Sequence, residues 1–134
     1  MKPQTTINKI DEILNTDNNR NKIYSFLNKF SQCEVYVRYY LEMYYGENVD
    51  PDDIKLIRED IKSALLENGI CIEDERIITF IFGDTDNTDS RTCKRLRNKI
   101  THKLNKAHIK EVIRRYDELI SKMDEFIQLV NEQS

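Results

Sequence analysis

A histidine, an arginine and an amide lie close together in the last third of the chain. Arg97 and Asn98 are adjacent, and His102 follows four residues after the amide. An imidazole can transfer a proton near neutral pH, and a guanidinium can hold a phosphate and stabilise charge that develops on it. With an amide to orient either group, this set suits metal-free cleavage of a phosphodiester by a ribose 2′-hydroxyl. It lacks the carboxylates that a two-metal nuclease needs.

The three residues belong to a basic segment of an acidic protein. From Arg91 to Lys106 there are seven Lys or Arg residues and no acidic residue, whereas the whole chain has a net charge of −3. Any binding of nucleic acid must therefore use a local patch and not a global positive field.

A helix over 91–104 would divide this segment into two faces. Its apolar side chains fall within one sector of about 80° and would anchor it to a core; they are Cys93, Leu96, Ile100 and Leu104. The opposite side gathers Arg91, Arg95, Asn98 and His102. Arg97 lies between the two faces, nearer the apolar one, so its long side chain can swing toward His102 or run along the core edge.

One copy of this face is sparse for catalysis, because in-line cleavage needs both a base and an acid. A two-fold dimer with two such helices face to face would bring two histidines and several arginines into one cleft. The plain alternative is a solvated basic face on an ordinary helix.

The remaining segments are predicted to be helices that position this face, because their apolar residues recur at helical spacing. The predicted helices are 5–15, 20–45 after a break at 17–19, 50–69 with a start at Asp50-Pro51, and 107–131. The helix 20–45 is apolar on more than half its girth and belongs at the centre of a bundle. Residues 70–82 fit a buried helix or a strand; we favour a short helix, because no second strand signal exists for pairing.

Two further features have ordinary explanations. The tyrosines of 24–45 suggest either a base-stacking platform or amphipathic core packing, and the second is favoured; they are Tyr24, Tyr36, Tyr39, Tyr40, Tyr44 and Tyr45. The aspartates of the polar loop 83–89 suggest calcium only weakly, because the full loop spacing and its terminal glutamate are missing.

The composition favours a small all-α protein. At 134 residues one domain over 1–134 is expected. Three glycines and two prolines are too few for the turns of a sandwich or barrel. We therefore expect an antiparallel helical bundle of about four to five main helices.

Cysteine usage and hydropathy favour a cytoplasmic protein without metal or cofactor. The three cysteines, Cys33, Cys71 and Cys93, are far apart and odd in number, so neither a zinc site nor a disulfide framework is expected. No apolar region follows the first residues, so no signal peptide is expected, and no run approaches the length of a membrane span.

The segment Arg97-Asn98-Lys99-Ile100-Thr101-His102 resembles the signature of the HEPN superfamily. That signature is an Arg, four to six residues and a His, often with Asn, Asp or His after the Arg. The resemblance implies a bundle of four or five helices. Catalytic members are metal-independent endoribonucleases whose motifs meet at a dimer interface, and many are toxins or anti-phage defence effectors. The resemblance is specific over 97–102 and generic elsewhere.

By this resemblance Arg97 and His102 would be catalytic and Asn98 would support them. The surrounding cations would bind the RNA backbone; they are Arg91, Lys94, Arg95, Lys99 and Lys103. Some family toxins carry a Tyr two residues after the His, which an antitoxin modifies. Here that position is Leu104, which puts such control in doubt.

The resemblance leaves alternatives open. Many family members are inactive, so the chain could instead be a non-catalytic HEPN-like module that dimerises or docks onto a toxin–antitoxin or defence partner protein. A weaker possibility is a domain that binds nucleotides or second messengers through the same basic face.

Overall fold

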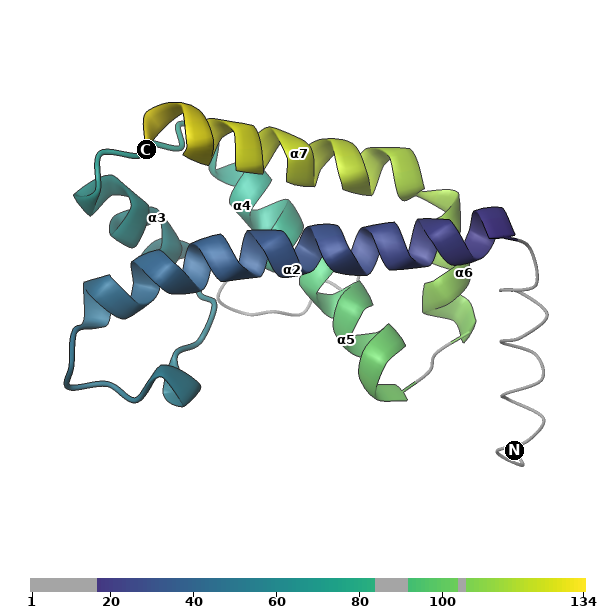
Figure 1. Cartoon of the computed structure of the whole chain (residues 1–134), viewed down its shortest axis with the longest axis horizontal. Coiled ribbons are helices and arrows are strands. Elements are labelled where there is room, and N and C mark those ends of the chain that lie inside the picture. Colours follow the sequence, from purple (N-terminus) through teal and green to yellow (C-terminus); the bar gives the residue numbers. More distant parts are fainter. Residues whose placement is uncertain (1–16, 84–91, 104–105) are drawn as a thin grey trace.

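The computed structural model describes residues 17–83, 92–103 and 106–134, and in this part of the chain every regular element is helical (Figure 1). The elements are α2 (Asp17–Tyr45), the short 3-10 helix η1 (Pro51–Asp53), α3 (Arg58–Glu67), α4 (Glu75–Phe82), α5 (Cys93–Lys103), α6 (Lys106–Arg114) and α7 (Tyr116–Gln133). The prediction of an all-α bundle is confirmed, and the described chain contains no strand. The predicted helix 5–15 and most of the loop 83–89 lie outside the described residues.

Helix α2 is the central element, as its wide apolar surface predicts. It contacts α3, α5, α6 and α7. Its buried residues are spaced by three and four along the helix: Ile23, Phe26, Phe30, Cys33, Val37 and Leu41. The ring of Phe30 meets that of Phe82 on α4 at 5.8 Å, and Phe82 meets Phe126 on α7 at 5.9 Å. These aromatic contacts join three helices in one core.

Helices α2 and α7 run in the same direction along their contact (Figure 1). Lys22 of α2 lies over the ring of Tyr116 near the start of α7. Further along both helices, Lys29 pairs with Asp124 at 2.7 Å. This pair of helices is therefore parallel within the bundle. Helix α2 begins at Asp17, three residues before the predicted start at 20, with that carboxylate in its first turn, where the helix dipole favours it.

The predicted helix 50–69 is wrong in its first half. Asp50 accepts a hydrogen bond from the backbone N–H of Asp52 at 3.0 Å, but it caps only the short turn η1. Ile54 and Ile57 have extended backbone conformations, and Ile54 and Leu56 are buried on either side of exposed Lys55. Leu56 fits no helical stripe because this segment has a period of two. A regular α-helix begins only at Arg58.

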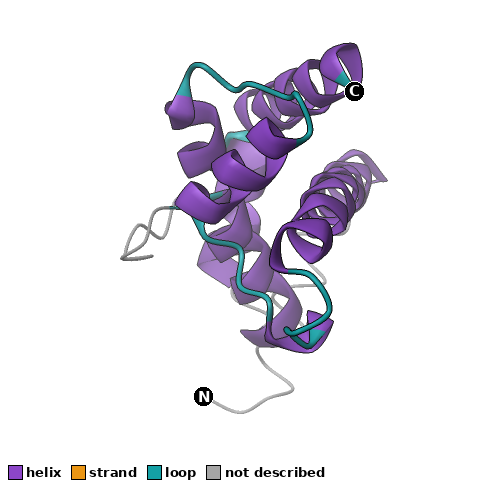
Figure 2. Ribbon diagram, turned by 90° about the vertical axis from the view of Figure 1, so that its left-hand side faces the viewer, coloured by secondary structure: helices purple, strands orange, loops and turns teal. Residues whose placement is uncertain are grey.

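The short helix predicted within 70–82 is confirmed as α4. Asp74 caps it by accepting a hydrogen bond from the N–H of Arg76 at 3.1 Å. Gly83 ends it at φ 87°, a left-handed conformation that favours glycine. Figure 2, turned by 90° from Figure 1, shows the described elements as helices connected by loops, with no strand among them.

The predicted helix 107–131 is divided at Arg115 into α6 and α7. The backbone hydrogen bonds continue across the break, from the Arg115 N–H to Glu111 and from the Leu119 N–H to Arg115. The interruption is therefore a bend without a loop. It lets α6 pack on α5 while α7 packs on α4, and both still contact α2.

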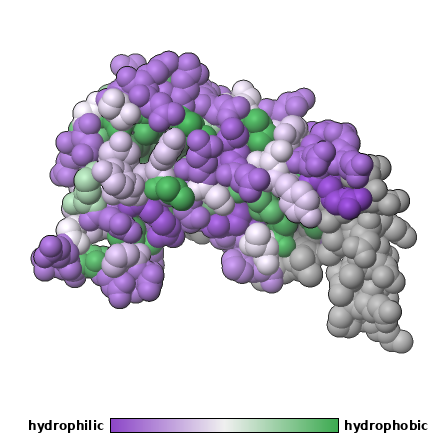
Figure 3. Space-filling view, in the orientation of Figure 1, coloured by the Kyte–Doolittle hydropathy of each residue, from purple (hydrophilic) through white to green (hydrophobic). Residues whose placement is uncertain are grey.

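The surface agrees with the amphipathic interpretation of the tyrosines. Tyr36, Tyr40, Tyr44 and Tyr45 pack partly buried against the core, whereas Tyr24 and Tyr39 are exposed. The face in the orientation of Figure 1 is largely hydrophilic with separate hydrophobic spots (Figure 3). Among the described helices, none is long and apolar enough to cross a membrane.

Candidate active site on α5

Helix α5 is anchored as its periodicity predicts. Cys93, Leu96 and Ile100 are all buried, and the helix contacts α2, α4 and α6. The fourth predicted anchor, Leu104, lies outside the described residues. The described start of the helix is Cys93, and Arg91, where the helix was predicted to begin, lies outside the described residues. The buried Thr92 accepts a hydrogen bond from the N–H of Arg95 at 3.2 Å and so caps the helix.

Arg97 runs along the core edge and does not swing toward His102. Its guanidinium carbon lies 4.6 Å from the centre of the Phe30 ring. Its Nη1 donates a hydrogen bond to Oε1 of Glu34 at 3.3 Å, and the two side chains are only 23% and 18% exposed. A guanidinium that stacks on a ring and pairs with a carboxylate is held in one orientation.

Glu34 is shared between two arginines. Its other oxygen pairs with Arg38 at 3.3 Å, and Arg38 also donates to the backbone carbonyl of Ile54 at 3.4 Å. Burial, with the nearby positive charge of Arg97, lowers the pKa of Lys94. Arg38 and Arg97 therefore pair with one carboxylate, and Lys94 is close enough to feel its charge. These four residues together carry a net charge of +2.

Asn98 connects this cluster to the outer face of α5. Its Oδ1 accepts a hydrogen bond from Nε of Arg97 at 2.9 Å. His102 lies one helical turn further along the same side and is exposed. The structure therefore joins Arg97 to Asn98 and puts Asn98 on the face of His102, while the guanidinium itself lies against α2.

Arg97 has one guanidinium nitrogen left over. Its Nε is bonded to Asn98 and its Nη1 to Glu34. Among the residues that the structure describes, no partner is bonded to Nη2. This nitrogen can therefore donate to an anion without breaking the contacts that orient the side chain.

The other predicted RNA-binding residues are less exposed than a solvated face would be. Lys94, Arg95 and Lys99 are half-buried. The Nε of Arg95 is buried without a hydrogen-bond partner in the described chain. Arg91 lies outside the described residues, and of Lys103 only the backbone is described. The RNA-binding assignments stay predictions.

Glu34 was not foreseen from the sequence. Its four-residue spacing from Arg38 predicts an ion pair on one helix. Its contact with Arg97 spans 63 residues of chain, and no local pattern signals it.

No described group of three or more His, Cys, Asp or Glu side chains is arranged to hold a metal ion. Comparison of the chain with protein-family models, curated proteins and solved structures finds no match. What the fold establishes is a small all-helical domain, and the likeness to the HEPN signature remains a property of residues 97–102.

Proposed function

We propose that this protein is a metal-independent endoribonuclease of the HEPN type, acting as a homodimer with a composite site, in a toxin or anti-phage role. The observation that carries the proposal is the hydrogen bond between Arg97 and Asn98, one helical turn from exposed His102. It joins a guanidinium that can hold a phosphate to the face of α5 that carries an imidazole able to move a proton.

Each residue has a distinct task in the reaction. The 2′-hydroxyl of one ribose attacks the adjacent phosphorus, and His102 of one protomer accepts its proton. The bond from phosphorus to the 5′-oxygen breaks, and His102 of the other protomer donates a proton to that oxygen. The products are a 2′,3′-cyclic phosphate and a 5′-hydroxyl. Nη2 of Arg97 donates to the phosphoryl oxygen on which negative charge accumulates.

Glu34 and Asn98 act on Arg97 and not on the substrate. With Nε and Nη1 occupied, the guanidinium has little freedom to rotate, so Nη2 is oriented before RNA binds. A carboxylate beside a catalytic arginine would cancel its charge if they were an isolated pair. Here Arg38 and Lys94 offset Glu34, and the cluster still attracts a phosphodiester.

The proposal is tested by cleavage of labelled RNA in EDTA, with Arg97→Ala and His102→Ala alongside the unchanged protein. The composite site is tested separately by measuring the mass in solution and by solving a dimer. Two His102 side chains facing one another across the interface would support the nuclease. Two His102 side chains facing separate solvent would contradict it.

A second candidate is a non-catalytic helical module that docks onto a partner. It is favoured by the exposed side of α2, where large apolar side chains fall within a sector of about 100°. These are Tyr24, Val35, Tyr39 and Met43, which are 48–64% exposed. In this case substitutions such as Val35→Asp would abolish assembly, while Arg97→Ala would leave it unchanged. RNA would not be turned over.

A further inference from the structure

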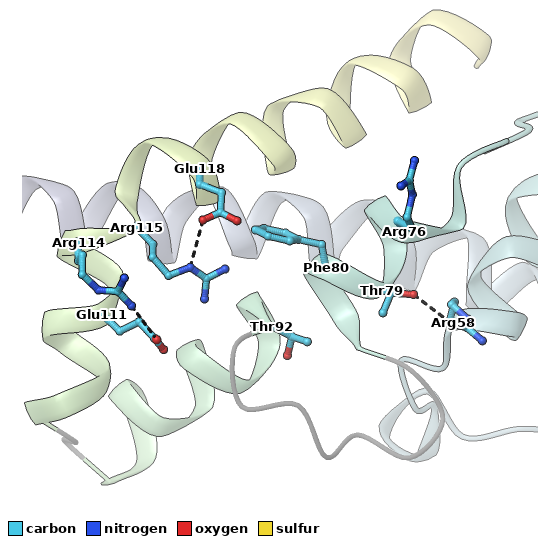
Figure 4. A pocket seen from close by; sticks show the side chains of 9 residues that line it. All are labelled: Arg58, Arg76, Thr79, Phe80, Thr92, Glu111, Arg114, Arg115 and Glu118. Carbon is cyan, nitrogen blue, oxygen red and sulfur yellow. Dashed lines mark hydrogen bonds and ion pairs between the residues drawn. The ribbon is translucent and has the colours of Figure 1, made fainter.

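A pocket of about 660 Å³ lies at the bend between α6 and α7. Arg97, Asn98 and His102 contribute nothing to its lining. Its walls come from the start of α3, from α4, from Thr92 before α5 and from the α6–α7 junction, with α2 behind (Figure 4).

Four arginines and two glutamates line this pocket, and each arginine has a carboxylate partner. Arg58 pairs with Glu59 at 2.7 Å and Arg76 with Asp74 at 2.9 Å, and these two carboxylates lie outside the lining. Arg58 comes from α3, Arg76 from α4, and Arg114 and Arg115 from the α6–α7 junction. The fold brings these arginines together, since Arg58 and Arg115 lie far apart in the sequence. Clusters of guanidinium groups from several elements are a common way to bind phosphate.

Arg115 is the least exposed arginine of the pocket. Its side chain is 12% exposed and its guanidinium carbon lies 5.6 Å from the centre of the Phe80 ring. Its Nε pairs with Glu118 at 3.3 Å. Figure 4 shows the guanidinium directed toward Phe80 and the centre of the pocket. At the bend between α6 and α7, the Arg115 side chain therefore points into the pocket.

The arginines on the walls can exchange partners. Arg114 pairs with Glu111 at 3.2 Å on the same helix, and its side chain is 71% exposed. Arg58 pairs with its neighbour Glu59 at 2.7 Å and also donates a hydrogen bond from α3 to the hydroxyl of Thr79 on α4 at 3.1 Å. Exposed ion pairs of this kind contribute little to stability. A phosphate can therefore take over these donors at small cost to the fold.

We propose that this pocket binds a small phosphate-bearing molecule that also carries hydroxyl or amino groups. The arginines bind the phosphate, and Glu111 and Glu118 accept hydrogen bonds from the hydroxyl or amino groups. Phe80 offers an apolar surface to the ligand's carbon skeleton. The two carboxylates disfavour an extended RNA strand, because its successive phosphates would have to pass them. A compact ligand can turn its phosphate toward the arginines and its donors toward the glutamates.

Isothermal titration of the full chain tests the site with four probes: inorganic phosphate, ribose 5-phosphate, adenosine monophosphate and a short single-stranded RNA. We expect saturable binding of at least one sugar phosphate, tighter than that of inorganic phosphate and of the RNA. The tighter binder of the two shows whether the site prefers a plain sugar phosphate or a nucleotide. Arg115→Gln and Arg114→Ala should each weaken the interaction, the first by about tenfold. Arg20→Ala, at an exposed arginine on α2, is the matched control and should change nothing.

Circular dichroism of each variant shows whether it is folded. If Arg115→Gln does not fold, Arg114→Ala is used for the comparison. No saturable binding of either sugar phosphate would overturn the proposal. So would sugar-phosphate binding that both pocket variants leave intact. RNA binding that is the tightest of the four and is lost in the pocket variants would show an RNA site instead. Because Arg97 and His102 do not line the pocket, failure here leaves the ribonuclease proposal standing, and the reverse also holds.

Discussion

Nη1 of Arg97 lies 3.3 Å from the carboxylate of Glu34 and thereby ties α5 to the central helix α2. Arg97, the proposed phosphate-binding residue of α5, therefore also holds two helices together. Its substitution is expected to affect stability as well as any activity, and the two effects have to be measured separately.

The Glu34–Arg97 contact should be measurable as a coupling energy. Both side chains are largely buried, so Glu34→Gln should lower the free energy of unfolding by roughly 1–3 kcal/mol. In a double-mutant cycle with Arg97→Gln, we expect a coupling of about 1 kcal/mol, measured by urea unfolding. The control is Glu42→Gln, at an exposed position of the same helix, where the change should stay within about 0.5 kcal/mol. Strictly additive effects would contradict the contact.

Phe30 should support Arg97 through its ring and not only through its volume. Phe30→Leu and Phe126→Leu remove similar apolar surface from one core, but only the first removes the ring beneath the guanidinium. We expect Phe30→Leu to lower the free energy of unfolding by about 0.5–1 kcal/mol more than Phe126→Leu does. In the Arg97→Gln background this excess should vanish. An excess that persists there would show that the ring acts by packing alone.

The three cysteines should differ sharply in reactivity. Burial raises the pKa of the Cys33 thiol to about 12 and also raises that of Cys93, whereas Cys71 is exposed. Because the thiolate is the reactive form, only Cys71 should react with an aromatic disulfide reagent in the native protein at neutral pH. Unfolding in guanidinium should release the other two. Cys71→Ser should abolish the native reaction, and rapid native labelling of more than one thiol would contradict the burial.

Tyr45 should make stability depend on alkaline pH. Burial, together with a hydrogen bond donated to Asp60, raises the pKa of Tyr45 from 10.0 to about 12. A raised pKa means that the folded state holds the phenolic proton more tightly. The resulting stabilisation is complete below pH 10 and is lost as the pH rises through 12. Tyr45→Phe should remove this part of the pH dependence in urea unfolding between those limits. An unchanged slope in the variant would refute the role of the hydroxyl.

Periodicity predicted those features of the fold that depend on one helix at a time. The stripe from Ile23 to Leu41 and the apolar side of α5 at Cys93, Leu96 and Ile100 lie where helical spacing put them. Each of these helices buries one face, and the apolar residues of that face recur at helical spacing in the local sequence.

The errors arose where the local signals fitted more than one structure. Asp50-Pro51 is a good start for a helix, and it starts only a short 3-10 turn because Ile54 and Leu56 are buried from an extended chain. At Arg115 no glycine or proline announces the bend. It arises where one segment packs on α5 and the next on α4.

The candidate site was predictable in part for the same reason. The outward position of His102 follows from helical spacing. The side chain of Arg97 had two available directions, and the choice between them was made by Phe30 and Glu34 on a helix distant in sequence. The pocket at Arg115 depends on the bend and on residues from three other segments, so no motif indicated it.

Cleavage of end-labelled RNA in EDTA tests the central claim most directly. We expect the unchanged protein to cut RNA and leave 2′,3′-cyclic phosphate ends. Arg97→Ala and His102→Ala should each lower the rate by about 100-fold or more, since they remove charge stabilisation and proton transfer respectively. Lys122→Ala, at an exposed position on α7, should retain the full rate. An unchanged protein that leaves RNA intact, activity that survives both substitutions, or activity that disappears with the chelator would contradict the proposed function.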